Sequence, residues 1–121
     1  MESTLRVREQ LAGLDLATAL ARVGGDEDLL KEIAQIFLDQ CPEALDEVKR
    51  AIEARDAEAL QHAAHSLKGS VGNFGAKIAY DAAFRLERLG RHGQFGETAE
   101  TLAELERALA ALRPELEKLT A

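Results

Sequence analysis

Apolar residues recur at steps of three and four along most of this chain, which is the spacing of one face of an α-helix. One such stripe runs through Leu30, Ile33, Phe37, Cys41, Leu45, Val48 and Ile52, and another through Leu102, Leu105, Leu109, Leu112, Leu116 and Leu119. Strand-like alternation is not sustained anywhere, and Ala, Leu, Glu and Arg, which are good helix formers, dominate the composition. The pattern predicts an all-α fold, an antiparallel four-helix bundle with a short extra helix at the N-terminal end.

Capping residues and glycines indicate where these helices begin and end. Asp15 can cap the short helix, which should end at Gly24-Gly25, and Asp26 can cap the helix that follows. Asp56 is suited to cap a third helix, which should run until the Gly-Asn-Phe-Gly sequence at 72–75. These signals predict the boundaries of the first three helices.

The later helices are predicted from small residues, leucines and prolines. A fourth helix from Ala76 to about Leu89 offers a small-residue face for close packing and should be stopped by Gly90. A loop over 91–96 then leads into the leucine-rich last helix. Pro42 should kink or briefly break the second helix, and Pro114 should kink the last one by removing a hydrogen bond.

Length and charge narrow the classes of function. The 121 residues suit one domain spanning 1–121, with 1–11 as a flexible or loosely packed segment. The formal net charge of -7 repels nucleic acid and anionic membranes, so we expect no nucleic-acid partner and a protein partner instead. Without an apolar stretch long enough for a membrane span, and with a charged N-terminus, the chain is expected to be cytoplasmic.

Cys41, the single cysteine, lies on an apolar stripe and is interpreted as a small buried core residue.

The third predicted helix carries the strongest functional signal. At about 100° per residue, Leu60, Ala64, Leu67 and Val71 fall within roughly 60° of one another and form an apolar face. His65 therefore points to water, with a cation one turn away and glycines where a side chain would obstruct an approaching partner. The residues that share this second strip are Gln61, His65, Lys68, Gly69 and Gly72.

The segment around His65 resembles the signature of histidine-containing phosphotransfer (HPt) domains of two-component phosphorelays. The matching residues are Ala-Ala-His-Ser-Leu-Lys-Gly-Ser at 63–70 and Asn-Phe-Gly-Ala at 73–76, and 16–30 looks like the entry to the family's four-helix bundle. The resemblance implies that His65 accepts a phosphoryl group from a receiver-domain aspartyl phosphate and passes it to another receiver domain. Lys68 would then match the lysine that assists the phosphoryl group, and Gly69 the glycine that leaves room for the receiver.

The chemistry of the side chains is consistent with that implication. A neutral imidazole has a lone pair for in-line attack on phosphorus, and the ammonium of Lys68 can offset charge on the phosphoryl oxygens. Gln61, one turn before His65, can hydrogen-bond the imidazole or the phosphoryl group, or simply occupy the surface.

The resemblance and the absent motifs together define the partners. The sequence holds no P-loop or ATP-lid motif, so we expect a carrier with no kinase activity of its own and no cofactor. Its partners would be receiver domains and an upstream histidine or hybrid kinase, which would supply the ATP chemistry and the divalent ion, and the chain itself is expected to be a monomer.

Two other classes of function remain open at this point. A metal-binding helical bundle would use His62 and His65, three residues apart, with His92 or Glu58 as further ligands. Both histidines lie away from the apolar stripe, whereas bundle metal sites face inward. A helical adaptor without chemistry would be distinguished by whether the histidine can be phosphorylated.

Overall fold

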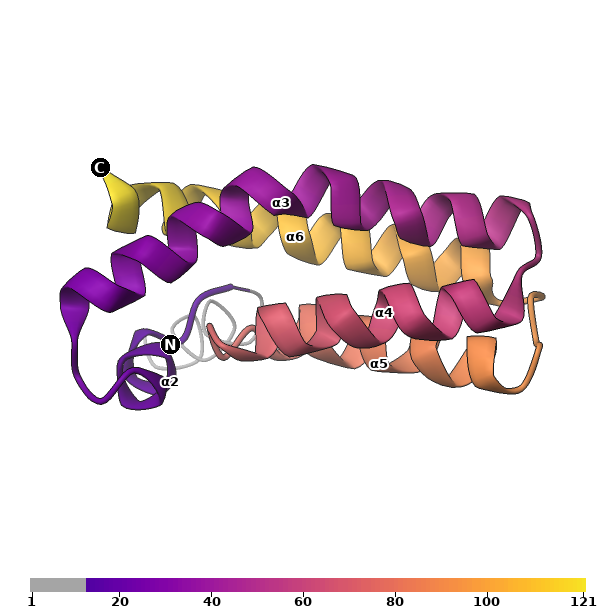
Figure 1. The fold of residues 1–121 in the computed structure, drawn as a ribbon, viewed down its shortest axis with the longest axis horizontal. Helices are drawn as coiled ribbons and strands as arrows, with labels where there is room; N and C mark the ends of the chain where they lie inside the picture. Colours follow the sequence, from indigo (N-terminus) through magenta and orange to yellow (C-terminus); the bar gives the residue numbers. More distant parts are fainter. Residues whose placement is uncertain (1–12) are drawn as a thin grey trace, which may run out of the picture.

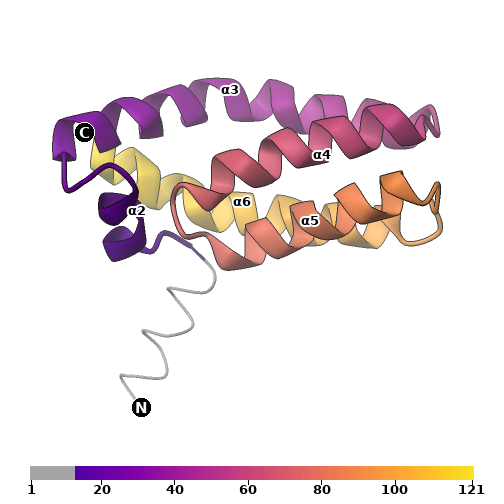
Figure 2. The same cartoon turned by 60° about the horizontal axis from the view of Figure 1, so that its bottom comes forward.

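The computed structural model describes residues 13–121, and within that range the regular structure is entirely helical. The elements are α2 (Leu16–Arg22), α3 (Glu27–Glu53), α4 (Ala57–Gly72), α5 (Lys77–Arg91) and α6 (Thr98–Thr120). The four long helices lie side by side and alternate in direction, and the short α2 lies at one end of the bundle (Figures 1 and 2). The predicted all-α four-helix bundle with a short N-terminal helix is confirmed, while the expectation for 1–11 falls outside the described residues.

Three aspartates begin the first three helices as predicted. Asp15, Asp26 and Asp56 each accept a hydrogen bond from the backbone N–H three residues later, at 3.2, 3.0 and 3.0 Å respectively. Gly24 and Gly25 follow α2 with φ angles of 64° and 81°, a conformation that glycine adopts without steric cost. Local capping chemistry therefore sets where α2, α3 and α4 start.

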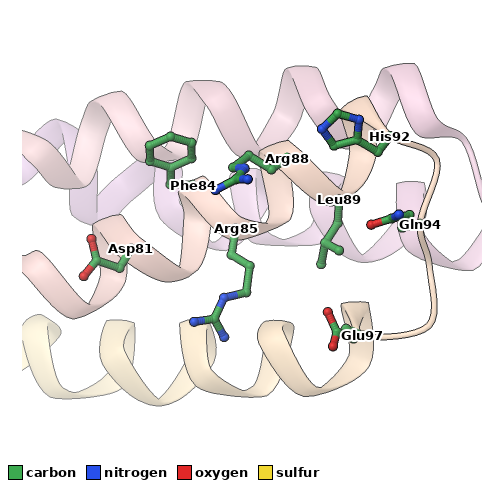
Figure 3. Close-up of a pocket in the computed structure, with 8 residues that line it drawn as sticks. All are labelled: Asp81, Phe84, Arg85, Arg88, Leu89, His92, Gln94 and Glu97. Atoms are coloured by element: carbon green, nitrogen blue, oxygen red, sulfur yellow. The ribbon is translucent and has the colours of Figure 1, made fainter.

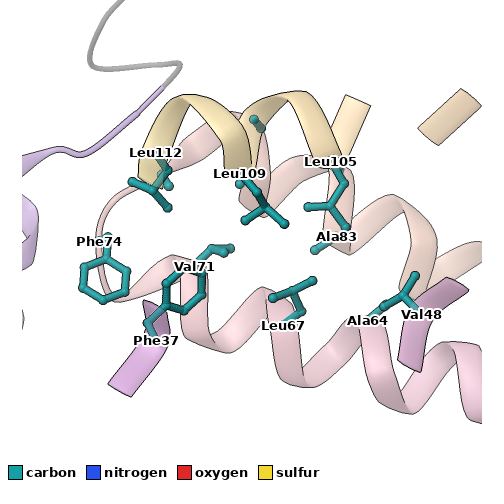
Figure 4. Close-up of a cluster of buried hydrophobic side chains, with 14 of the residues drawn as sticks. Phe37, Val48, Ala64, Leu67, Val71, Phe74, Ala83, Leu105, Leu109 and Leu112 are labelled. Atoms are coloured by element: carbon teal, nitrogen blue, oxygen red, sulfur yellow. The ribbon is translucent and has the colours of Figure 1, made fainter. Parts of the chain in front are cut away.

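The core lies along the axis of the bundle and includes both predicted stripes. Leu67 and Val71 of α4 point toward the leucines of α6 (Figure 4). At one end of the core, the Phe37 ring meets the Phe74 ring edge-on, with centroids 5.4 Å apart. The fully buried large side chains of the long helices include Leu60, Leu67, Val71, Leu105, Leu112 and Leu116. The apolar face predicted for α4 is therefore the buried face.

The two prolines do not interrupt their helices. α3 continues through Pro42, so the predicted break is absent, and Figure 1 shows the N-terminal part of α3 inclined to the rest of the helix. α6 likewise continues through Pro114. Both prolines are exposed, so solvent can satisfy the carbonyl that loses its partner.

Cys41, predicted to be buried, is half-buried against the core. Burial raises the pKa of its thiol, although the charge of Arg113 partly offsets this effect.

Gly90 corrects the prediction for the end of the fourth helix. α5 does not stop there but continues to Arg91, and Gly90 is buried within the helix. A Cβ at Gly90 would lie 2.7 Å from the backbone N of Gln61 and 3.0 Å from the carbonyl oxygen of Ala57. The glycine is required because the backbones of α4 and α5 approach each other closely at this point.

Candidate functional site

His65 lies on the outer face of α4, one turn beyond the contact with Gly90. Its side chain is 64% exposed, whereas its neighbours Ala64 and Leu67 are buried in the core. The outward orientation predicted from the helical periodicity is confirmed. The imidazole can therefore be reached by another molecule without any movement of the bundle.

One nitrogen of the His65 ring is engaged by a carboxylate from the next helix. Nδ1 of His65 lies 2.7 Å from Oε2 of Glu87, which projects from α5. An ionised carboxylate can only accept hydrogen bonds, so in the neutral ring the proton resides on Nδ1, which donates it to Glu87. Nε2 then carries the lone pair, and the contact selects both the tautomer and the orientation of the ring.

Glu87 is buried despite its charge, and three cationic or polar groups surround it. Its side chain is 4% exposed, and the Lys68 ammonium lies 2.7 Å from Oε1. The Arg91 guanidinium is 3.7 Å from Oε2, one turn further along α5. Burial raises the pKa of Glu87, but the contacts of Lys68 and His65 more than offset that effect, so the pKa lies below its ordinary value. The carboxylate therefore stays ionised at neutral pH.

Lys68 is held more firmly than an ordinary surface lysine. Its side chain is only 17% exposed, because the ammonium contacts Glu87 and lies over the ring of Phe84, 4.8 Å from the ring centroid. The amine is thus fixed on the side of His65 that faces α5. Sequence periodicity placed Lys68 near His65 but could not reveal that both side chains share one carboxylate.

The two glycines of the strip have different surroundings. Apart from the backbone of its own turns, Gly69 has no heavy atom of residues 13–121 within 4 Å of the position a Cβ would take. Gly72 faces Tyr80 of α5, with a Cβ position 3.5 Å from the ring, an ordinary contact distance. Gln61 is half-buried and lines the same shallow hollow as His65. Gly69 is therefore not needed for the packing of a described neighbouring helix.

The residues considered for a metal site do not converge. His62 and Glu58 line the hollow beside His65, but His92 lines a different hollow, formed by α5 and the loop that leads to α6. Within residues 13–121, no group of three or more His, Cys, Asp or Glu side chains is arranged to hold a metal ion.

Glu87 is the site residue that sequence reasoning missed. A signal was present, because Glu87 stands one turn after Ala83 and three residues before Gly90, both on the buried face of α5. A charged side chain at an inward position needs a partner, since burying an unpaired charge is costly. Which residue pairs with it depends on the register between α4 and α5, which the sequence does not state.

Comparisons with known proteins identify the family of the chain. The family model of the Hpt domain matches residues 32–115, which include His65, Lys68 and Glu87. The chain belongs to the Hpt domain family. The crystal structure of histidine-containing phosphotransfer protein B (HptB) from Pseudomonas aeruginosa PAO1 is similar to this Hpt domain, with a TM-score of 0.80 and 28% sequence identity. The similarity covers 87% of this chain and 91% of the HptB chain, whereas no curated protein sequence matches.

Membership of the family establishes the general role of the chain. The Hpt domain is a phosphotransfer intermediate of two-component signalling. None of the helices in the range 13–121 is long and apolar enough to cross a membrane.

Proposed function

We propose that this Hpt domain, acting as one domain over 1–121, accepts a phosphoryl group on Nε2 of His65 and passes it between receiver domains. The observation that carries the proposal is the exposed imidazole whose Nδ1 is held by the buried carboxylate of Glu87. That geometry leaves a lone pair on the outward nitrogen of a fixed ring, which is what in-line attack on phosphorus requires.

The transfer exchanges one bond to phosphorus for another. Nε2 attacks the phosphorus of a receiver aspartyl phosphate, the bond from phosphorus to the aspartyl oxygen breaks, and the aspartate leaves as a carboxylate. The phosphorylated ring still bears its Nδ1 proton and so acquires positive charge, which the Glu87 carboxylate offsets through the same hydrogen bond. Transfer to the second receiver is the reverse reaction with another aspartate.

The neighbouring residues take supporting roles in this proposal. The ammonium of Lys68 is one turn from His65 and offsets negative charge on the phosphoryl oxygens. Gly69 leaves the surface open for a docked receiver, and Gln61 and Gly72 support the same surface. Glu87 acts through His65 and is a positioning residue.

The partners follow from this chemistry. Receiver domains donate and accept the phosphoryl group, an upstream histidine or hybrid kinase supplies it, and the chain acts as a cytoplasmic monomer without a cofactor or kinase activity of its own. A helical adaptor without chemistry would need neither an exposed imidazole nor a buried carboxylate to orient it.

Incubation with a phosphorylated receiver domain tests the proposal. The wild-type chain should acquire phosphate that is labile in acid and stable in base, as expected for phosphohistidine. His65→Gln should abolish labelling, whereas His62→Gln, at an exposed position one turn away, should retain it. Labelling that survives His65→Gln and disappears in His62→Gln would overturn the assignment, and a complete lack of labelling would favour the adaptor.

A further inference from the structure

Phe84 is exposed on α5 without a role in the core. The residue is 39% exposed, and within residues 13–121 it does not belong to the side chains that form the hydrophobic core or pack against it. Its ring stands edge-on to Tyr80, with centroids 6.3 Å apart and an interplanar angle of 89°. Because Phe84 neither belongs to that core nor packs against it, core packing does not explain why a phenylalanine stands at this position.

Two cations lie against the Phe84 ring. The Lys68 ammonium is 4.8 Å from the ring centroid, and the Arg88 guanidinium carbon is 6.0 Å away. Both distances fall within the range of about 6 Å over which the quadrupole of an aromatic ring attracts a cation. Figure 3 shows the Phe84 ring and the Arg88 side chain next to each other on α5, while Arg85 extends toward α6, where it pairs with Glu104.

Lys68 therefore lies between the Glu87 carboxylate and two aromatic rings, that of Phe84 at 4.8 Å and that of Tyr80 further away, at 6.0 Å. Glu87 alone would fix one end of the ion pair, but the flexible four-carbon stem of a lysine lets the ammonium move around a single anion. The Phe84 ring restricts that motion and shields the pair from water, consistent with the 17% exposure of the Lys68 side chain. Shielding strengthens the electrostatic effect of the ammonium on any charge that develops nearby.

We propose that Phe84 is a positioning residue for phosphotransfer that acts by holding the Lys68 ammonium beside His65. The inference rests on the proposed function, because it requires Lys68 to assist the phosphoryl group. Its effect should lie in the rate of the chemical step and not in the affinity for a receiver. An exposed aromatic side chain that served only as a docking contact would show the opposite behaviour.

Phosphoramidate is a suitable probe because it carries a phosphoryl group without a protein surface. In this reaction the P–N bond of phosphoramidate breaks, ammonia leaves, and a bond forms between phosphorus and Nε2 of His65. Phe84→Leu keeps an apolar side chain of similar size but removes the π face, and Phe84→Tyr keeps the ring. We expect Phe84→Leu to slow labelling of His65 about two- to fivefold, and Phe84→Tyr to stay close to wild type.

Introducing Phe84→Leu into the Lys68→Ala variant tests whether Phe84 affects the labelling rate through Lys68. Lys68→Ala should itself slow labelling about tenfold or more, and adding Phe84→Leu to it should change nothing further, because the two substitutions remove the same interaction. Ile78→Ala is a matched control, since Ile78 is a similarly exposed apolar residue on α5, 43% exposed, and should label at the wild-type rate.

The outcomes separate this inference from the function on which it rests. If Lys68→Ala is labelled as fast as the wild type, Lys68 does not assist the phosphoryl group. The role proposed for Lys68 and the inference about Phe84 are then both wrong. If Lys68→Ala is slow while Phe84→Leu matches wild type, only the inference is overturned. A Phe84→Leu variant that labels normally with phosphoramidate, yet needs a higher concentration of phosphorylated receiver for half-maximal transfer, would make Phe84 a docking contact instead.

Discussion

At the scale of single residues, the site is organised by one buried carboxylate. Glu87 engages Nδ1 of His65 with one oxygen and the Lys68 ammonium with the other. The imidazole and the amine are thereby held relative to each other through a shared partner. A fixed pair of side chains can act on a phosphoryl group without the reorganisation that two free side chains would need.

The first prediction concerns the charge of Glu87. Glu87→Gln retains the shape of the side chain but replaces a charge-assisted hydrogen bond with a weaker neutral one, so phosphotransfer to His65 should slow about tenfold. Circular dichroism should show an unchanged helix content. The measurement is the single-turnover rate from a phosphorylated receiver, and a rate equal to wild type would reduce Glu87 to a structural ion-pair partner.

The second prediction follows from the lowered pKa of Glu87. A carboxyl group whose folded-state pKa lies below its ordinary value of 4.5 contributes stability that is fully present above that value and is lost as the pH falls through the folded pKa. The melting temperature of the wild type should therefore fall more steeply below pH 4.5 than that of Glu87→Gln, which cannot titrate. Parallel melting curves for the two proteins through this acidic range would contradict the burial of a charged Glu87.

The third prediction concerns the open position at Gly69. Gly69→Gln should hold or raise the melting temperature, because glycine within a helix costs about 1 kcal/mol and no described neighbour opposes a side chain there. The same variant should weaken transfer from a receiver while leaving labelling by phosphoramidate unchanged. A large loss of melting temperature, with transfer reduced only in proportion to the folded fraction, would mean that Gly69 serves packing.

At the scale of helices, Gly69 and Gly90 both lie inside helices but have opposite surroundings. Gly69 faces open space, whereas Gly90 is packed against the backbone of α4. The sequence predicts Gly90 as a helix stop because a glycine after a run of helix formers usually ends a helix. It cannot distinguish that use of glycine from close packing between two helices, which depends on the neighbouring helix.

The fourth prediction tests this contrast. Gly90→Ala should destabilise the fold by about 1–3 kcal/mol, because the added Cβ would meet the Gln61 backbone N at 2.7 Å and a backbone cannot yield as a flexible side chain can. Gly69→Ala is the matched control and should be neutral or stabilising. The measurement is the free energy of unfolding in urea, and equal values for the two variants would mean that α4 and α5 separate readily.

The elements themselves could be predicted because their signals are local. The caps at Asp15, Asp26 and Asp56 and the apolar stripes depend only on nearby residues, and the outward position of His65 follows from the period of one helix. Glu87 could not be assigned in this way. Its role arises from a contact with His65 between two helices, and the sequence pattern within α5 records only that a charge occupies an inward position.

At the scale of the whole molecule, one continuous core connects all four long helices. Leu112 of α6 is fully buried in it, on the element that contributes none of the side chains around His65. The fifth prediction is that Leu112→Ala lowers the free energy of unfolding by about 2–5 kcal/mol through loss of contacts and a residual cavity. Transfer per folded molecule should be unchanged, and a specific loss of transfer would couple α6 to the chemistry.

The close contact at Gly90 also fixes how far α5 can slide along α4. Because these helices run in opposite directions, each turn along α4 beyond Gln61 is matched by a turn back along α5 from Gly90. This correspondence brings His65 level with Glu87. A slip of one turn, about 5.4 Å, would carry the carboxylate out of reach of the imidazole. Gly90 thus sets the register between α4 and α5 on which the site depends. A substitution at Gly90 leaves every reacting group in place but can still misalign His65 with Glu87.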